Sequence, residues 1–543
     1  MAMAGDGMVA SVPSRLTGRA GLALLVLLLT VLALLPLLGL ARQTLAAGVG
    51  AGLGPQGWQQ LANTALLVLA VGFGSGLLGS INAWLSSGCQ FPGRRWLRPA
   101  QLLPLATPAY LLAATLIDLG GRLSWQVQGP GWAVAVLVLA TYSYVFLLAS
   151  ESFANLGRQP REVCRSLGLG AWAFWFRVAL PLALPAIGAG VALAGMEVVN
   201  DLGAVELLGV PTLSVGILQR WQSDGDPAGA VALALLALLI VSLLVGGERW
   251  LRRRSRRWVS PGRRDPAETW RLHGWRALAA LTLTLLPPLI SVGLPLVWAL
   301  CSLDQLRSES WSELAVLLLR SLGLGLAATA LTLAAGLLLA EARRWLRQPL
   351  LLRLGFLAGM GYALPGAVLA LGLLLIGNGL GLAPLPLLCW GYGVRFLAVA
   401  KQGLDAAFEQ LPVSLDEAAT VLGCRWTAVL RRVHLPLLRG PLLVGALLVF
   451  VDVVKELPLT LALRPFDFDT LPVRVFQYAS DERLGAALLP ALLILLLGLI
   501  AAAALMPGLP GSTTWREGEV GAGPEEPDRL PRANHPRRRE WAG

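Results

Sequence analysis

Lysine, histidine and cysteine are scarce in this chain of 543 residues. The only two lysines, Lys401 and Lys455, are followed by Gln402 and Glu456, so neither can belong to the phosphate loop of an ATPase, which needs Gly-Lys followed by Ser or Thr. The five cysteines form no CxxC pair, and no ligand-type residues have metal-binding spacing. No nucleophile has a visible base beside it. We therefore expect no catalytic site, metal site, bound cofactor or disulfide framework, and we predict that the chain is not an enzyme.

Charged residues are also few, at 14% of the chain, whereas 56% of the residues are hydrophobic and the mean hydropathy is +0.66. A soluble protein of this size does not need so apolar a composition. Apolar runs of about twenty residues, the length that crosses a bilayer as a helix, recur along the chain. The sequence thus predicts an all-α membrane protein, embedded in the lipid bilayer by about twelve transmembrane helices. The expected spans are 21–41, 61–85, 99–118, 131–152, 183–206 and 227–247 in the first half, and 277–300, 314–340, 354–377, 383–402, 437–462 and 485–506 in the second.

The net charge of +12 is concentrated in a few connections between the expected spans. Arginines cluster at 94–98, at 253–264 and at 343–353, which all lie on one side of the membrane if the N-terminus lies there too. By the positive-inside rule that side is cytoplasmic, so both termini are expected in the cytoplasm. The first apolar run is too long for a typical signal peptide, and we expect an uncleaved first span. The basic residues are read as topological signals, and we expect no nucleic-acid partner.

Two stretches of the chain, 255 residues apart, carry the same pattern. Each has a Glu six residues before a Gly, and a Leu-Pro pair that ends thirteen residues after that Gly. The segment from Glu to Gly can form a short helix, the Gly permits a positive φ and a sharp turn, and the Pro suits a break or the first turn of the next helix. The residues of the pattern are Glu162, Gly168 and Pro181 in the first copy, and Glu417, Ala418, Ala419, Gly423 and Pro436 in the second.

The repeat extends beyond these loops, because Gly79 aligns with Gly336 and Pro108 with Pro365. Each half has an even number of expected spans, so the two halves have the same orientation and form two parallel six-helix repeats around a pseudo-two-fold axis. We divide the chain into a first repeat, an Arg-rich cytoplasmic linker, a second repeat, and a C-terminal tail whose composition is typical of disorder. The bounds are 1–248, 249–275, 276–506 and 507–543.

The duplicated pattern resembles the EAA loop, the hallmark of permease subunits of ABC importers. The resemblance implies the type I importer architecture and a multi-pass protein of the bacterial inner membrane. In that family each loop forms short cytoplasmic helices that dock on an ATPase subunit. We therefore expect two ATPase partners, which use ATP and Mg, and an external substrate-binding protein. The first copy departs from the family at Val163 and Cys164, where Ala is usual.

Further blocks of sequence resemble the fused permeases of ferric-iron ABC importers. They are the segments 196–217, 361–366, 449–470 and 478–483. Fused permeases for thiamine share the layout and the loops, so thiamine or another small cation is the alternative cargo. A closed cluster of iron ligands is not readable, and the resemblance implies that an external binding protein selects the cargo.

Charged residues inside the expected spans are candidates for a translocation path or gate, because a charge in a bilayer normally faces protein or water. Glu197 and Asp201 are four residues apart and hence on one helix face, and Asp452 and Glu456 repeat that geometry with Lys455 between them. These residues either line the path or form a polar network that holds the spans near the breaks at 203 and 458. Arg395 is a possible partner for one carboxylate, and His434 is interpreted as a loop contact.

An ion-coupled secondary transporter is the main rival from another class. It could also have twelve spans and buried carboxylates, but it would not need two EAA-like loops. A membrane enzyme fits less well, because no reactive constellation is visible.

Overall fold

The computed structural model describes residues 13–47, 53–154, 159–168, 171–255, 270–301, 311–346, 348–359, 361 and 364–505. Almost all of this chain is helical, which is how a backbone satisfies its polar groups inside a bilayer. The two-residue strand β1 (Cys89–Gln90) of the first repeat pairs in parallel with β2 (Trp270–Arg271), which lies near the C-terminal end of the linker. The predicted all-α fold is confirmed. The predicted tail, 507–543, lies outside the described residues, as do 256–269 of the linker.

The first repeat begins with the long helices α1 and α2, and its later part contains the first EAA-like loop. Its helices are α1 (Pro13–Ala47), α2 (Gly54–Gly88), α3 (Arg94–Ala100), the 3-10 turn η1 (Leu103–Ala106), α4 (Ala109–Arg122), α5 (Pro130–Ala154), α6 (Gln159–Ser166), α7 (Ala171–Phe174), the π-helical turn η2 (Trp175–Ala179), α8 (Leu180–Asn200), α9 (Gly203–Leu207), α10 (Leu213–Gln222) and α11 (Pro227–Ser255).

The second repeat follows the same order. Its helices are α12 (Trp275–Pro288), the π-helical turn η3 (Leu289–Gly293), α13 (Leu294–Cys301), α14 (Trp311–Trp345), α15 (Pro349–Ala358), α16 (Gly366–Leu380), α17 (Pro384–Glu409), α18 (Ser414–Val421), α19 (Trp426–Val429), the π-helical turn η6 (Leu430–His434), α20 (Leu435–Lys455), α21 (Pro458–Leu463), α22 (Leu471–Ser480) and α23 (Leu484–Leu505). Helices α14 and α2 are both 35 residues long, and α18 corresponds to α6.

Eight helices of the described chain are long and apolar enough to cross a membrane, or nine if Arg94–Ala106 and Ala109–Arg122, which meet at 92°, form one broken span. The bend follows from Pro108, whose extended backbone precedes α4; Pro365 has the same conformation before α16. Of the remaining expected spans, 354–377 is divided between α15 and α16, and 383–402 lies in α17, which carries Arg395 and Lys401. The total of twelve spans stays a prediction.

The first helix of each repeat packs against the other repeat. On one side, the Trp390 indole donates a hydrogen bond to the Leu32 carbonyl of α1 at 3.0 Å. On the other, the Trp298 indole of α13 donates to the Asp118 carboxylate of α4 at 2.7 Å. Glycines permit the close approach of α1 to α16, since a Cβ on Gly372 would lie 2.4 Å from the Pro36 carbonyl oxygen. The two repeats are therefore interlocked rather than merely adjacent.

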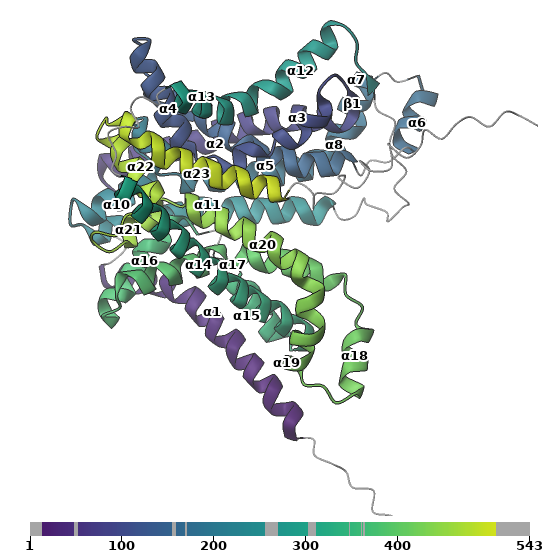
Figure 1. Cartoon of the computed structure of the whole chain (residues 1–543), viewed down its shortest axis with the longest axis vertical. Coiled ribbons are helices and arrows are strands. Elements are labelled where there is room, and N and C mark those ends of the chain that lie inside the picture. Colours follow the sequence, from purple (N-terminus) through teal and green to yellow (C-terminus); the bar gives the residue numbers. More distant parts are fainter. Residues whose placement is uncertain are drawn as a thin grey trace, which may run out of the picture.

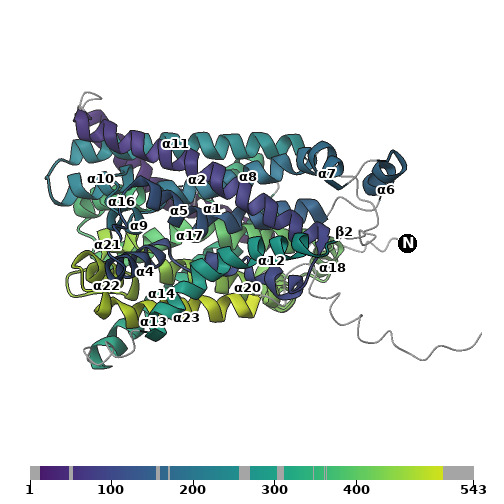
Figure 2. The same cartoon turned by 90° about the horizontal axis from the view of Figure 1, so that it is seen from above.

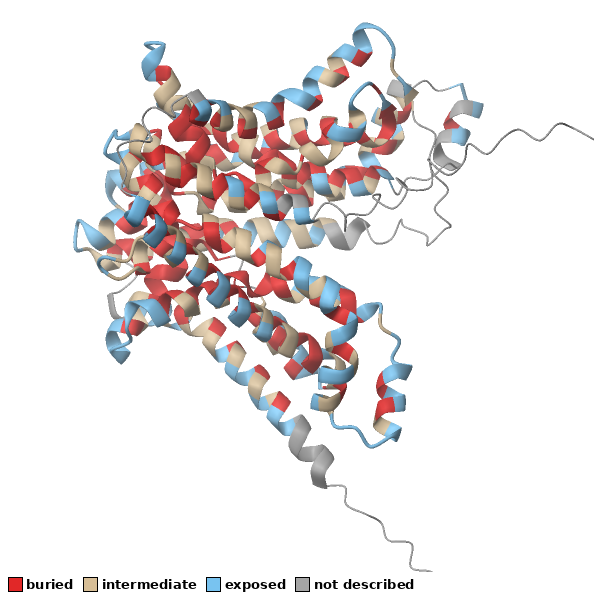
Figure 3. Ribbon diagram, viewed as in Figure 1, coloured by how far each residue is buried: buried red, intermediate tan, exposed pale blue. Residues whose placement is uncertain are grey.

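The two EAA-like loops lie at one end of the molecule. Helices α6 and α18 stand apart there, whereas α10, α16, α21 and α22 lie close together at the opposite end (Figures 1 and 2). Buried residues gather where the repeats meet (Figure 3). Exposed tryptophans mark both ends of the helices, as expected for residues at a membrane interface: Trp58, Trp125 and Trp311 at one end, and Trp96, Trp250 and Trp275 at the other.

Candidate functional site

The fifth long helix of the first repeat stops where the sequence places its acidic pair. Helix α8 ends at Asn200, and Asp201 has an extended backbone with φ −67° and ψ 132°. The Asp201 carboxylate accepts hydrogen bonds from the backbone amides of Ala204 and Val205, at 3.0 and 3.1 Å. These amides begin the short helix α9, whose first turn has no backbone partner for them. The Asp201 side chain thus caps the first turn of α9 from the residue before its N-cap position, Leu202.

The second repeat has the same break. Helix α20 ends at Lys455, and Glu456 is extended, with φ −70° and ψ 125°. Its carboxylate accepts hydrogen bonds from the amides of Leu459 and Thr460, at 3.0 and 3.1 Å, and so caps α21. Arg395 lies 3.7 Å from the same carboxylate, as the sequence suggested for one of the acids. The prediction that each acidic pair shares one helix face was wrong, because both helices end before the second acid.

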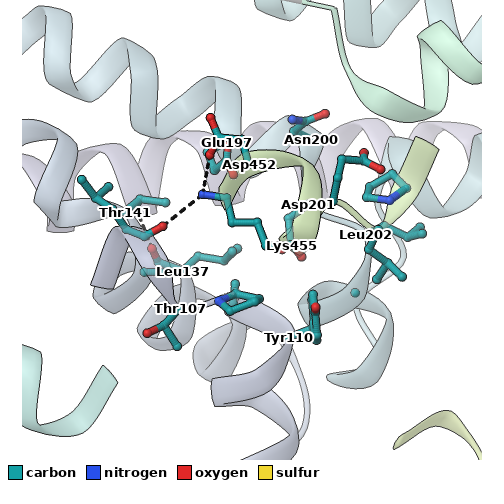
Figure 4. A pocket seen from close by; sticks show the side chains of 18 of the residues that line it. Thr107, Tyr110, Leu137, Thr141, Glu197, Asn200, Asp201, Leu202, Asp452 and Lys455 are labelled. Carbon is teal, nitrogen blue, oxygen red and sulfur yellow. Dashed lines mark hydrogen bonds and ion pairs between the residues drawn. The ribbon is translucent and has the colours of Figure 1, made fainter. Parts of the chain in front are cut away.

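The five residues predicted for the path or gate nevertheless come together. They line one cavity of about 90 Å³ between the two repeats. The first repeat contributes η1, the start of α4, α5 and the break after α8; the second contributes α17 and the break after α20. Figure 4 shows the side chains around this cavity. Its charged members are Glu197, Asp201, Arg395, Asp452, Lys455 and Glu456.

Polar contacts in the cavity join the two repeats. The Lys455 ammonium pairs with Asp452 at 2.9 Å within its own helix and donates to the Leu105 carbonyl of the first repeat at 3.0 Å. In the opposite direction, the Asn200 side-chain oxygen accepts from the Gly366 amide at 2.7 Å and from Arg395 at 3.1 Å. Asn200 and Lys455 are equivalent positions, each directly before the capping acid. Each repeat therefore reaches across to the other from the end of its broken helix.

Glu197 differs from the other three acids of the cavity. In the described part of the chain no group donates a hydrogen bond to its carboxylate, and no cation lies within ion-pair distance of it. It lies on the same side of the cavity as Asp452 and Lys455 (Figure 4). Lys455 is the cation whose charge acts on Glu197, whereas Asp201 and Glu456 are occupied by helix caps, and we expect Glu197 to be the acid that is open to a passing ion.

The EAA-like loops form helix–turn–helix units. Gly168 and Gly423 have φ of +71° and +76°, as expected for the turn residues. Pro181 and Pro436 lie in the first turns of α8 and α20, and each short helix before them continues through a π-helical turn without a break.

Both units leave apolar side chains in solvent. Val163 and Leu167 are exposed around α6, and Val421 and Leu422, at 85% and 81% exposure, around α18. Glu162, Glu417 and Ala418 are exposed as well, whereas Ala419 is buried. Exposed apolar side chains on these short helices are candidates for contact with another protein.

His434 is a buried contact of the second loop, as interpreted from the sequence. Its partners, Glu341 and Asp416, were not predicted, and neither was Arg344, which binds Asp416. The sequence does show charged residues, Glu341 and Arg344, at the end of an otherwise apolar helix. No sequence pattern, however, indicates that Glu341 contacts His434, which lies 93 residues further along the chain. In the described residues, no group of three or more His, Cys, Asp or Glu side chains has the arrangement of a metal site.

Comparison with known proteins gives the same two-fold division. A family model described as "Binding-protein-dependent transport system inner membrane component" matches residues 75–257 and again 332–505. The two matches begin at equivalent positions of α2 and α14 and end within or just beyond the last long helix of each repeat. The family model therefore covers both EAA-like loops and both broken helices. It leaves out the first helix of each repeat, which packs against the other repeat.

Two similar proteins extend over both repeats. An Fe(3+)-transport system permease protein of Haemophilus influenzae is 26% identical over 81% of this chain and 88% of its own length. A thiamine transport system permease protein of Salmonella typhimurium is 27% identical over 75% of this chain and 81% of its own. A molybdenum transport system permease protein of Escherichia coli, 30% identical, matches 33% of this chain and 86% of itself.

Replacing single acids of the cavity distinguishes an acid that lines the path, Glu197, from the acids that cap helices, Asp201 and Glu456. We expect Glu197→Gln to lower cargo uptake while the yield of folded protein stays normal, because the carboxylate makes no hydrogen bond that the change would break. Asp201→Asn should keep the yield, since Asn caps helices as well as Asp, and should lower uptake less than Glu197→Gln does. Glu456→Ala should lower the yield, because it uncaps α21 and leaves Arg395 buried without its partner, at a cost of about 3–5 kcal/mol.

The measurement is uptake per folded transporter, with yield taken from size-exclusion chromatography. Normal uptake by Glu197→Gln, or a loss of yield as large as that of Glu456→Ala, would contradict the assignment of Glu197 to the path.

Proposed function

We propose, from the premise that the chain belongs to the family of binding-protein-dependent transport system inner membrane components and is a permease subunit of an ABC importer, that its cargo is ferric iron. The protein is a multi-pass inner-membrane protein. An external binding protein delivers the iron, and separate subunits hydrolyse ATP. The observation that carries the proposal is the acidic cavity between the repeats, together with the two-repeat resemblance to an Fe(3+)-transport permease.

The charge of the cavity favours a cation. Four carboxylates face two cationic side chains, Arg395 and Lys455, so the formal charge of the lining is −2. Both cations already have carboxylate partners, at 3.7 and 2.9 Å, which leaves the acids in excess. In a site with little water, such a field attracts a cation and repels an oxyanion. Sulfate and molybdate are therefore disfavoured, although relatives named for their transport match a single repeat.

The size of the cavity favours a metal ion over thiamine. A volume of about 90 Å³ holds an ion with a few waters or oxygen ligands. Pockets for organic ligands of ordinary size enclose roughly 300–1,000 Å³. Carboxylates and carbonyl oxygens are also the ligands that hard cations prefer. The excess acids are spread over two breaks rather than gathered into a closed cluster, so the site suits transit, and the external binding protein supplies selectivity.

Two ATPase subunits dock, in this proposal, on α6 and α18. The two helices lie at the same end of the molecule and are related by the repeat (Figure 1). Their exposed apolar side chains supply contact area for a partner, and the chain itself lacks a nucleotide-binding loop. This end is the cytoplasmic one by the positive-inside rule, with both termini on that side. Since the repeats are interlocked at the opposite end, drawing α6 and α18 together would rock them about the cavity.

Transport by the reconstituted assembly tests the cargo. The permease, its ATPase and its binding protein are placed in lipid vesicles, and uptake of radioactive Fe(III), thiamine and molybdate is followed. We expect uptake of iron that requires ATP and the binding protein, and none of molybdate. Uptake of thiamine in place of iron would contradict the assignment of ferric iron as the cargo. Uptake driven by an ion gradient without ATP would overturn the importer mechanism in favour of a secondary transporter.

The turn residue Gly423 tests the docking role of α18. Gly423→Val should reduce co-purification of the ATPase several-fold at normal permease yield, because a β-branched residue resists a φ of +76°. An added Cβ would meet nothing within 4 Å, so the effect comes from the backbone alone. Gly440→Val is the matched control, since Gly440 lies in α20 with equally open space and ordinary helical geometry.

Gly168 has almost the same φ, +71°, so Gly168→Val strains the first turn equally. A difference between the two variants then measures how much each loop contributes to docking. If Gly423→Val binds the ATPase as well as Gly440→Val does, α18 is not a docking helix.

A further inference from the structure

A buried charged cluster lies beneath α18 and connects it to two other helices of the second repeat. His434, in the π-helical turn before α20, is fully buried. Its Nδ1 lies 2.5 Å from a Glu341 carboxylate oxygen of α14, and its Nε2 lies 2.8 Å from an Asp416 oxygen of α18. Arg344 of α14 donates to the other Asp416 oxygen and to the backbone carbonyls of 408, 411 and 412. These four side chains are called the His434 cluster below.

The contacts of the ring determine its proton count. A neutral imidazole carries one N–H and one lone pair, so it can donate to a single carboxylate and must repel the other. Both ring nitrogens of His434 are within hydrogen-bond distance of carboxylate oxygens. The second Glu341 oxygen accepts a hydrogen bond from the Trp345 indole at 2.9 Å. Either protonation state of Glu341 permits that bond. Two N–H donors, and hence an imidazolium, satisfy both acids at once.

The charge balance gives the same answer. With an imidazolium, the cluster contains two carboxylates and two cations and is neutral overall. With a neutral ring and an ionised Glu341, one negative charge would be buried without a partner, at Glu341, which is 0% exposed. The other element against the ring, α17, contributes the face-to-edge ring of Phe408 at 5.2 Å and no charge toward it. The charged side chains in the last turns of that helix, Lys401, Asp405 and Glu409, pair with one another and with Arg343, and its other charge, Arg395, lies at the cavity beside Glu456.

The first repeat holds its loop by different chemistry. At the positions equivalent to Glu341 and His434 it has Trp84 and Ala179. Trp84 packs against Phe153 and Phe174, with ring centroids 5.5 and 6.0 Å apart, in an apolar cluster that also buries Cys164 of α6. Phe153 corresponds to Phe408, so both repeats have a phenylalanine ring at this position beside the docking loop. The indole fills the space that the second repeat gives to an ion pair.

We propose that His434 is a positioning residue that holds the second docking helix most firmly while its ring is doubly protonated, whereas the equivalent positions of the first repeat, Trp84 and Ala179, carry no group that titrates in this range. The inference deepens the proposed function, because it assigns proton-dependent ATPase coupling to α18 alone. Loss of the proton leaves Glu341 and Asp416 repelling each other across the ring, so α18 is held to α14 by the Arg344 contacts alone and opens more often. The two ATPase contacts of one transporter therefore respond differently to cytoplasmic pH.

Hydrogen–deuterium exchange of the full-length permease in lipid nanodiscs tests the proposal. Exchange rates are corrected for the intrinsic effect of pH and compared for the segments 414–422 and 159–166 between about pH 6 and about pH 9, a range that includes the titration of histidine. We expect the wild-type segment 414–422 to lose protection by at least about tenfold as pH rises, with 159–166 unchanged as the internal control.

Two variants isolate the proton. Glu341→Gln lets a neutral ring accept from the new amide at Nδ1 and donate to Asp416 from Nε2, so 414–422 should stay protected at every pH. His434→Gln should leave 414–422 poorly protected even at low pH, with 159–166 unaffected. If wild type and Glu341→Gln respond to pH alike, or if 414–422 and 159–166 respond alike, the proposal is wrong.

The same samples with the ATPase added test docking separately. Protection of 414–422 on adding the ATPase supports the proposed function whatever the pH response, and its absence refutes docking without affecting the proton clamp.

Discussion

A backbone amide without a partner is costly inside a bilayer, and this constraint shapes the centre of the molecule. Two long helices, α8 and α20, stop where the repeats meet, and each is followed by a short helix whose first amides have no partner in its own backbone. Asp201 and Glu456 supply the missing acceptors. The broken helices thus account for two of the four carboxylates of the cavity, whereas Asp452 pairs with Lys455 and Glu197 caps no helix.

The same breaks tie the repeats together. The residues that precede the caps, Asn200 and Lys455, each bind a backbone group of the opposite repeat. Together with the exchanged first helices, they form an interlocked region around the cavity, while α6 and α18 stand apart at the other end (Figure 2). A molecule built this way suits motion in which the docking helices approach or separate and the capped centre changes its shape. The two docking helices are held by different contacts, aromatic packing for α6 and the His434 cluster for α18. The two repeats therefore differ in how they support their docking helices.

Sequence alone predicted much of this arrangement, because its strongest signals repeat. The spacing of Glu162 to Gly168 and of Glu417 to Gly423 indicated a short helix and a turn, and the turns have the positive φ that Gly permits. The acids expected in a path do meet in one cavity. The spacing of four residues does not reveal the helix ends, because Asp201 and Glu456 are extended and lie just beyond α8 and α20. The exchange of first helices and the pairing of Glu341 with His434 depend on contacts between distant segments, which no local pattern records.

In the proposed mechanism, ATP binding by the partner subunits draws the two docking helices together. Spin labels at Leu167 and Val421, which are 69% and 85% exposed beside the two docking turns, allow the separation to be measured by pulsed electron paramagnetic resonance. We predict a shorter distance when the ATPase subunits bind ATP without hydrolysing it, and a return to the longer distance after hydrolysis. A distance distribution that is the same with and without ATP would contradict the account.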